Sequence, residues 1–136
     1  MSVNLQYPVP HVWPTVVHML DDAARRAPHH VALVCGDESL TYLQYAACVS
    51  GLAHELRAMG AGEGGRVALV MSNSLDIAIA TFAVQASGAQ VVPLNPAYTS
   101  TELEPMLQSA HAHAILYDAC CRTVDTGCAT TGQSGR

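Results

Sequence analysis

Two kinds of apolar segment alternate along most of the chain, and this alternation constrains the fold more than any other feature. Short continuous apolar runs, typical of strands, recur between longer segments with apolar residues at helical spacing. The expected strands lie at residues 31–35, 39–41, 66–71, 90–93 and 114–117. The continuous apolar run at 31–35 is expected to be a buried strand. Strands that alternate with helices favour a parallel sheet with right-handed crossovers. We therefore predict an α/β fold with a partial doubly wound, mainly parallel sheet and helices on both faces.

Capping signals indicate where two of the helices begin. The segment Thr41-Tyr-Leu-Gln44 matches a capping box, in which two side chains satisfy free backbone amides at the helix start. The segment Thr99-Ser-Thr-Glu102 matches a second box, before a helix that contains Pro105. A helix accepts proline only near its first turn, so we expect this helix to start late, at Thr101.

The most apolar helix is expected from Leu75 to Ser87, after a polar segment that can cap it and before Gly88. Apolar residues lie nearly all round this helix, which predicts that it is buried on more than one side. If its neighbours leave part of it uncovered, the chain is expected to bind a hydrophobic dye or to self-associate.

Composition divides the chain into a folded part and a tail. Half of the 136 residues are hydrophobic and 12% are charged, which indicates a globular composition and not a disordered one. From Cys120 onward the chain is rich in Thr, Gly, Ser and Cys and has no periodicity. We therefore predict an N-terminal extension at 1–13, a folded unit at 14–118 and a disordered or non-family tail at 119–136.

Charge and cysteine usage limit the partners and the compartment. The formal net charge is −5 at pH 7, and all six basic residues are arginines, so a basic face for nucleic acid is not expected. The five cysteines have no zinc or redox spacing, which favours a reducing, cytoplasmic compartment. Neither a signal peptide nor a transmembrane segment is expected.

Three groups of residues resemble site motifs. Gly60 to Gly65 matches G-x-G-x-x-G, but it follows an expected helix and precedes a strand, the reverse of what dinucleotide binding requires. We interpret it as a helix end and a turn. Several histidines and cysteines are of the residue types that bind metal ions, but no carboxylate lies at a spacing that would complete a site. We expect these side chains to be solvated. These residues are His29, His30, His111, His113, Cys120, Cys121 and Cys128.

Asp118 follows an expected strand, where a phospho-acceptor aspartate sits in receiver-like α/β domains. Such sites rely on a lysine to hold the phosphate and on an acidic pair for magnesium. The chain contains no lysine at all. We therefore expect no phospho-acceptor role, and we assign no catalytic, cofactor-binding or metal-binding residue.

The order of these signals resembles the N-terminal subdomain of the adenylate-forming (AMP-binding) superfamily, which includes acyl-CoA synthetases, luciferases and peptide-synthetase adenylation domains. The resemblance covers Thr15 to Tyr117, and its most specific parts are Leu40-Thr-Tyr42 and the run from Ser87 to Tyr98. Within this superfamily, the chain is most similar to fatty-acid–CoA ligases and related carboxylate–CoA ligases. Tyr45 is one departure, because leucine is usual at this position.

The resemblance implies a parent enzyme that uses ATP, magnesium and CoA to convert a carboxylic acid, a fatty acid in our interpretation, to acyl-AMP and then acyl-CoA. It also implies a Ser/Thr/Gly-rich phosphate loop with a lysine, acidic residues for magnesium and ribose, and a catalytic lysine in a C-terminal lid. Thr130-Thr-Gly132 faintly resembles that loop but lacks the Pro-Lys that should follow. We therefore expect a truncated, inactive ligase whose family sequence ends near Asp118. The alternative is a stand-alone, non-catalytic α/β module that binds a partner or an acyl ligand.

Overall fold

The computed structural model describes residues 13–118, which form four helices and five strands. The helices are α1 (Val16–Arg26), α2 (Tyr42–Ala58), α3 (Leu75–Ser87) and α4 (Ser100–Ala110). The strands are β1 (Val31–Cys35), β2 (Glu38–Thr41), β3 (Arg66–Val70), β4 (Gln90–Leu94) and β5 (Ala114–Tyr117). The expected extension up to residue 12, the expected disordered tail and its three cysteines lie outside the described residues.

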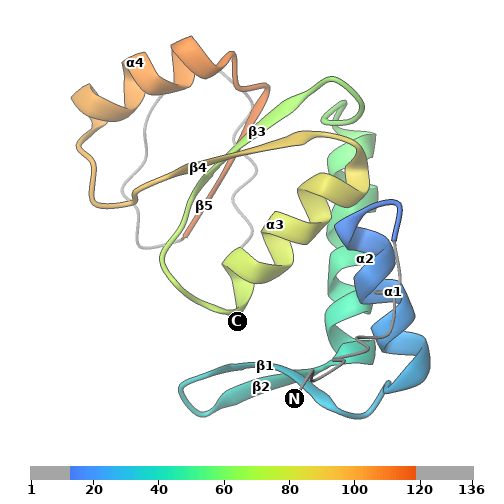
Figure 1. The fold of residues 1–136 in the computed structure, drawn as a ribbon. Helices are drawn as coiled ribbons and strands as arrows, with labels where there is room; N and C mark the ends of the chain where they lie inside the picture. The colour runs from blue at the N-terminus through green and yellow to red at the C-terminus, as the bar shows by residue number, and fades with distance from the viewer. Residues whose placement is uncertain (1–12, 119–136) are drawn as a thin grey trace, which may run out of the picture.

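A three-stranded parallel sheet of order β4-β3-β5 forms the centre of the fold. Its middle strand β3 is fully enclosed, because every residue from Val67 to Val70 is at most 5% exposed. Val67 and Leu69 join a core with α2 and α3, whereas Ala68 and Val70 pack with α4. Successive side chains of a strand point to opposite faces, so the helices cover both faces of the sheet (Figure 1). The predicted doubly wound α/β fold is confirmed.

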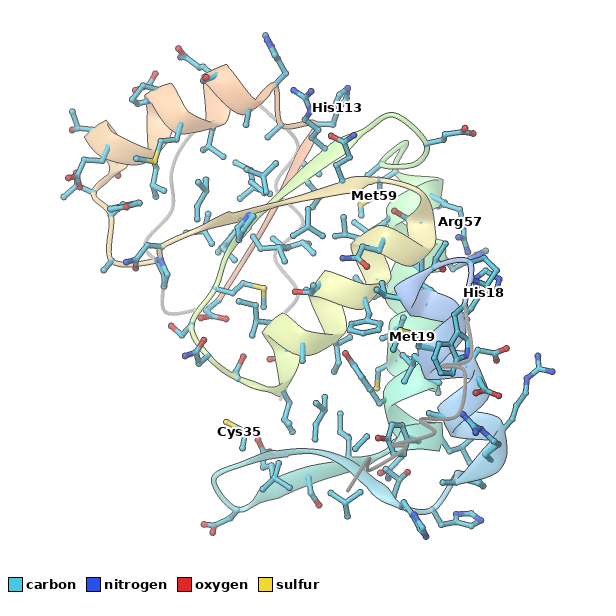
Figure 2. The ribbon with its side chains drawn as sticks, in the orientation of Figure 1. His18, Met19, Cys35, Arg57, Met59 and His113 are labelled. Atoms are coloured by element: carbon cyan, nitrogen blue, oxygen red, sulfur yellow. The ribbon has the colours of Figure 1, made fainter. Side chains whose placement is uncertain are left out.

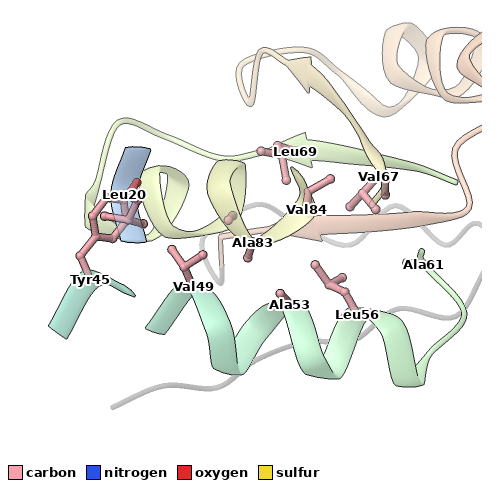
Figure 3. Close-up of a cluster of buried hydrophobic side chains, with 12 residues drawn as sticks. Leu20, Tyr45, Val49, Ala53, Leu56, Ala61, Val67, Leu69, Ala83 and Val84 are labelled. Atoms are coloured by element: carbon pink, nitrogen blue, oxygen red, sulfur yellow. The ribbon is translucent and has the colours of Figure 1, made fainter. Parts of the chain in front are cut away.

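The larger core lies between α2 and α3 and against one face of the sheet. Figure 3 shows these two helices side by side, with Val49 and Leu56 of α2 directed toward Ala83 and Val84 of α3. Leu56, Ala83 and Val84 have no exposed surface. Burying one large aliphatic side chain contributes about 1.5–3 kcal/mol, so this helix pair is a main source of stability for the fold.

Helix α3 has the predicted bounds and is enclosed on more than one side. The Ser74 hydroxyl accepts a hydrogen bond from the Ile77 amide at 3.4 Å, and Gly88 ends the helix in the left-handed region at φ +95°. Its large apolar residues are half-buried or buried. The exposed large apolar side chains of the described residues belong to other segments. They are Val16, Met19, Val31, Val34, Leu43, Met59, Tyr98 and Met106.

The expectation that residues 31–35 form a buried strand is wrong. Strand β1 pairs with β2 in an antiparallel hairpin that is separate from the parallel sheet, and Val31 and Val34 are 57% and 69% exposed. Ala32 and Leu33 of β1 and Leu40 of β2 are the hairpin residues that pack on the core. A continuous run of five apolar residues has no polar-apolar alternation. Its pattern therefore cannot show whether the strand is buried or exposed.

Helix α4 begins at Ser100, one residue before the expected start, and keeps Pro105 in its second turn. The Glu102 carboxylate accepts hydrogen bonds from the amide and the hydroxyl of Thr99, both at 2.8 Å, and these bonds fix the early start. Since Pro105 has no N–H, the carbonyl of Thr101 loses its helical donor. Thr101 is exposed, so water can replace this bond at small cost.

Candidate functional site

The carboxyl ends of β3 and β5 form the edge of the sheet where a ligand is expected in an open α/β fold. From β3 the chain crosses through α3 to β4 on one side, and then returns through α4 to β5 on the other side. Because β4 and β5 lie on opposite sides of β3, the order of the strands in the sheet reverses between β3 and β5. Ligands of open α/β sheets bind in the crevice outside the carboxyl ends of the strands at such a topological switch point.

Polar residues follow both strands at this edge. The backbone amide of Ser72, after β3, donates a hydrogen bond to the Asp118 carboxylate, after β5, at 2.6 Å. Asn73 and Ser74 complete the connection to α3, and Ser74 caps that helix. The structure therefore brings Asp118 to the carboxyl edge, where it joins the two strand ends. Hydroxyls, one amide and one carboxylate can position a ligand, but they supply no positive charge.

The cations of the described residues lie elsewhere. Within residues 13–118 the basic side chains are four arginines, and there is no lysine. Arg25 and Arg26 form ion pairs with Asp21 and Asp22 on α1. Arg57 belongs to the last turn of α2 and Arg66 begins β3, so both are at the amino end of the sheet. None of these arginines is in the segments that form the carboxyl edge.

The glycine-rich loop from Gly60 to Gly65 has the structural role that its position predicted. It leads from α2 into β3, and Gly60 adopts φ +83° directly after the helix. The loop also packs against the end of α3, because a Cβ added to Gly88 would lie 3.3 Å from the Glu63 nitrogen. The glycines thus allow close approach of two backbone segments, and the order helix-loop-strand agrees with the interpretation as a helix end and turn.

The histidines lie in separate places. His29 and His30 occupy the turn between α1 and β1, and His111 ends α4 at φ +49°. His113 is labelled in Figure 2 where α4 leads into β5, and its Nδ1 accepts a hydrogen bond from the Arg66 amide at 3.2 Å. Residues 13–118 contain no group of three or more His, Cys, Asp or Glu side chains arranged to hold a metal ion.

Sequence reasoning missed the contacts that Arg66 makes at the amino edge. Its guanidinium donates to the Ala110 carbonyl at 2.9 Å and to the Gln90 side chain at 3.2 Å. Its carbonyl accepts from the His113 amide at 2.7 Å. These bonds tie α4, β4 and β5 to the start of β3. The order of the strands in the sheet, which the sequence does not show, was needed to find them.

Tyr45 is an ionisable residue of α2 that is buried in the main core. Its ring is 5% exposed and packs edge-on against Phe82, with ring centroids 5.5 Å apart. Burial raises the pKa of Tyr45 to about 12. The hydroxyl therefore stays protonated and donates to the Ala78 carbonyl of α3 at 3.0 Å. This residue links α2 to α3 and has a structural role.

Comparison with known proteins assigns the chain to a family. The family model described as AMP-binding enzyme matches residues 20–134. Phosphinothricin tripeptide synthetase PhsC of Streptomyces viridochromogenes is 36% identical over 102 residues, which are 75% of this chain and 9% of that protein. The medium/long-chain-fatty-acid–CoA/3-oxocholest-4-en-26-oate–CoA ligase of Mycobacterium marinum is 32% identical over 103 residues, 76% of this chain and 19% of that protein.

The fold is similar to that of solved structures as well. NpsA-ThdA, an artificially fused adenylation–PCP di-domain from Klebsiella oxytoca, superposes with a TM-score of 0.78 at 25% identity. The superposed region is 85% of this chain and 22% of the NpsA-ThdA chain. The chain thus spans less than a quarter of the length of each of these proteins. No helix in the part of the chain that the structure describes is long and apolar enough to cross a lipid bilayer. On the family match and the shared fold together, the chain belongs to the AMP-binding enzyme family.

Proposed function

We propose that residues 14–118 are the structural part of an adenylate-forming domain that supports one wall of its acyl-binding region. The parent activity is ATP-dependent activation of a carboxylic acid to acyl-AMP and then to acyl-CoA, with ATP, magnesium and CoA as its cofactors. The observation that carries this proposal is the carboxyl edge of the sheet. It is built from β3, β5 and Asp118, and none of the arginines of the described chain is in the segments that form it.

We further propose that this chain alone does not form acyl adenylates. Adenylation brings a carboxylate against the α-phosphate of ATP, and two anions approach only where cations and backbone amides offset their charges. The carboxyl edge carries the Asp118 carboxylate, and the 136 residues include no lysine. The residues that hold ATP, magnesium and CoA therefore belong to another part of the parent protein.

We propose that the parent enzyme activates a fatty acid and that it is cytoplasmic. The similarity to the fatty-acid–CoA ligase of Mycobacterium marinum supports this choice. A second candidate is activation of an amino acid, which the similarity to the tripeptide synthetase PhsC favours. Both candidates share the adenylation step and differ in the acid and in the final acceptor.

ATP–pyrophosphate exchange tests the proposal in two parts. The 136-residue chain is assayed with palmitate, octanoate and a panel of amino acids, and the longest polypeptide that its gene encodes is assayed beside it. We expect no exchange above background with the short chain, and exchange that depends on a fatty acid with the long one. Exchange by the short chain would overturn the proposal that this chain alone does not form acyl adenylates. Exchange by the long polypeptide with amino acids alone would overturn the fatty-acid assignment.

A further inference from the structure

A cavity of about 290 Å³ lies between α1 and α2, beside the C-terminal end of α3. Its floor is apolar and belongs to the main core, since Leu20, Val49 and Ala53 line it and are 6%, 3% and 1% exposed. Arg57 and Ala86 line it where α2 and α3 lead toward β3 and β4. The cavity is therefore near the amino end of the sheet, away from the carboxyl edge described above.

The polar rim of this cavity carries one positive and one negative side chain. Its charged side chains are Arg57 and Asp21, and Asp21 forms an ion pair with Arg25 at 2.9 Å. The charge of Asp21 is therefore offset by a neighbour on α1, whereas Arg57 has no acidic partner within residues 13–118. Arg57 is therefore the rim charge that can attract an anion.

Arg57 is held in place at the rim. One of its terminal nitrogens donates a hydrogen bond of 2.7 Å to the Ala86 carbonyl, in the last turn of α3. A guanidinium has five N–H groups in a planar fork, and this bond uses one of them. Figure 2 shows Arg57 and His18 on the same side of the molecule, beside α1 and α2. A positioned guanidinium above an apolar floor is an arrangement that fits a carboxylate with an apolar tail.

We propose that this cavity binds a monocarboxylate with a straight apolar tail of about eight carbons. The tail lies on Leu20, Val49 and Ala53, and the carboxylate accepts hydrogen bonds from Arg57. Roughly 30 Å³ per non-hydrogen atom, the share of a water molecule in the liquid, gives space for about ten such atoms, the number in octanoate. The inference depends only on residues of this chain and goes beyond the proposed function.

A titration of the ¹⁵N-labelled 136-residue chain with octanoate, followed by amide chemical shifts, tests the proposal. We expect saturable shifts confined to residues around Leu20, Val49 and Arg57, with a Kd on the order of 1 mM for a ligand of this size. Octan-1-amine has the same tail and the opposite charge, and we expect it to bind about tenfold more weakly or not at all.

Three variants locate the site. Ser50→Leu fills the cavity from its rim and is expected to abolish the shifts, whereas Ser109→Leu, the same change on the exposed face of α4, is expected to leave them unchanged. Arg57→Gln is expected to weaken octanoate binding about tenfold and to leave octan-1-amine unaffected. No shift of the wild-type chain at about 10 mM octanoate, shifts centred on the β1–β2 hairpin, or equal binding of the amine would overturn the proposal.

Discussion

The glycines Gly51 and Gly88 illustrate how differently one residue type can be constrained in the same domain. Gly51 is exposed in the middle of α2, and a Cβ added there would meet nothing within 4 Å. Gly88 has φ +95°, and its added Cβ would lie 3.3 Å from the Glu63 nitrogen. The first position needs no glycine, whereas the second does.

Alanine substitutions at these two positions should therefore act in opposite directions. Gly51→Ala is expected to raise the free energy of unfolding by about 0.5–1 kcal/mol, because alanine favours the helix. Gly88→Ala is expected to lower it by about 1–2 kcal/mol, because of left-handed strain and the contact with Glu63. Urea denaturation of both variants and the wild type measures these values. A change of the same sign in both variants would contradict this assignment.

Tyr45 predicts a loss of stability at high pH. The ordinary pKa of tyrosine is 10.0, and burial raises the pKa of Tyr45 to about 12, so the unfolded chain releases this proton first as the pH rises. The stabilisation is complete below pH 10 and is lost between about pH 10 and 12, by at most about 2–3 kcal/mol.

The variant Tyr45→Phe isolates this effect from the other tyrosines. We expect the wild type to be the more stable below pH 10 by about 1 kcal/mol, the value of one hydrogen bond to Ala78. This advantage should shrink or reverse as the pH approaches about 12. Chemical denaturation at several pH values gives the difference, and parallel curves for the two proteins would be inconsistent with a raised pKa.

At the scale of whole elements, helix boundaries could be predicted well, and strand environments could not. Ser74 caps the start of α3 with its hydroxyl, and Gly88 ends the helix in the left-handed region. Both signals are local and can be found in the sequence. Strand β1 was located correctly, but its position in an exposed hairpin depends on how α2 and α3 cover one of its faces. Local signals determine where an element begins and ends, whereas tertiary packing decides which of its faces is buried.

The start of α4 makes a prediction at low pH. Hydrogen bonds from the Thr99 amide and hydroxyl lower the pKa of Glu102 below its ordinary value of 4.5. The carboxylate therefore stabilises the folded state above about pH 4.5, and this contribution is lost as the pH falls through the lower, folded-state pKa. Thermal melts should show Glu102→Gln less stable than the wild type at pH 7, with a smaller difference at about pH 3.

Glu104→Gln is the matched control on the same helix. The Glu104 side chain accepts a single long hydrogen bond from Gln108, at 3.4 Å, and makes no cap. We expect its difference from the wild type at pH 7 to be small. A difference for Glu102→Gln that does not change between neutral and acidic pH would argue against the cap as its cause.

On the scale of the whole molecule, the alternation of strands and helices was sufficient to predict the doubly wound sheet. The family was predicted from the resemblance carried by Leu40-Thr-Tyr42 and by the run from Ser87 to Tyr98. The contact between Ser72 and Asp118 was not predictable, because it depends on β5 pairing beside β3. The same is true of the Arg66 contacts at the opposite edge. Contacts between segments more than 40 residues apart follow from the strand order, and local sequence patterns carry no information about that order.

The central claim is that residues 14–118 serve as the structural part of an adenylate-forming domain. A chimera tests it most directly, with these residues in place of the matching segment of the Mycobacterium marinum ligase. We predict that the chimera retains ATP–pyrophosphate exchange with a fatty acid within about tenfold of the ligase, a change of about 1.4 kcal/mol in the barrier. The same chimera with Leu69→Asp, which places a charge in the buried sheet, should lose it. A chimera that fails to fold, or that folds without exchange, would contradict the claim.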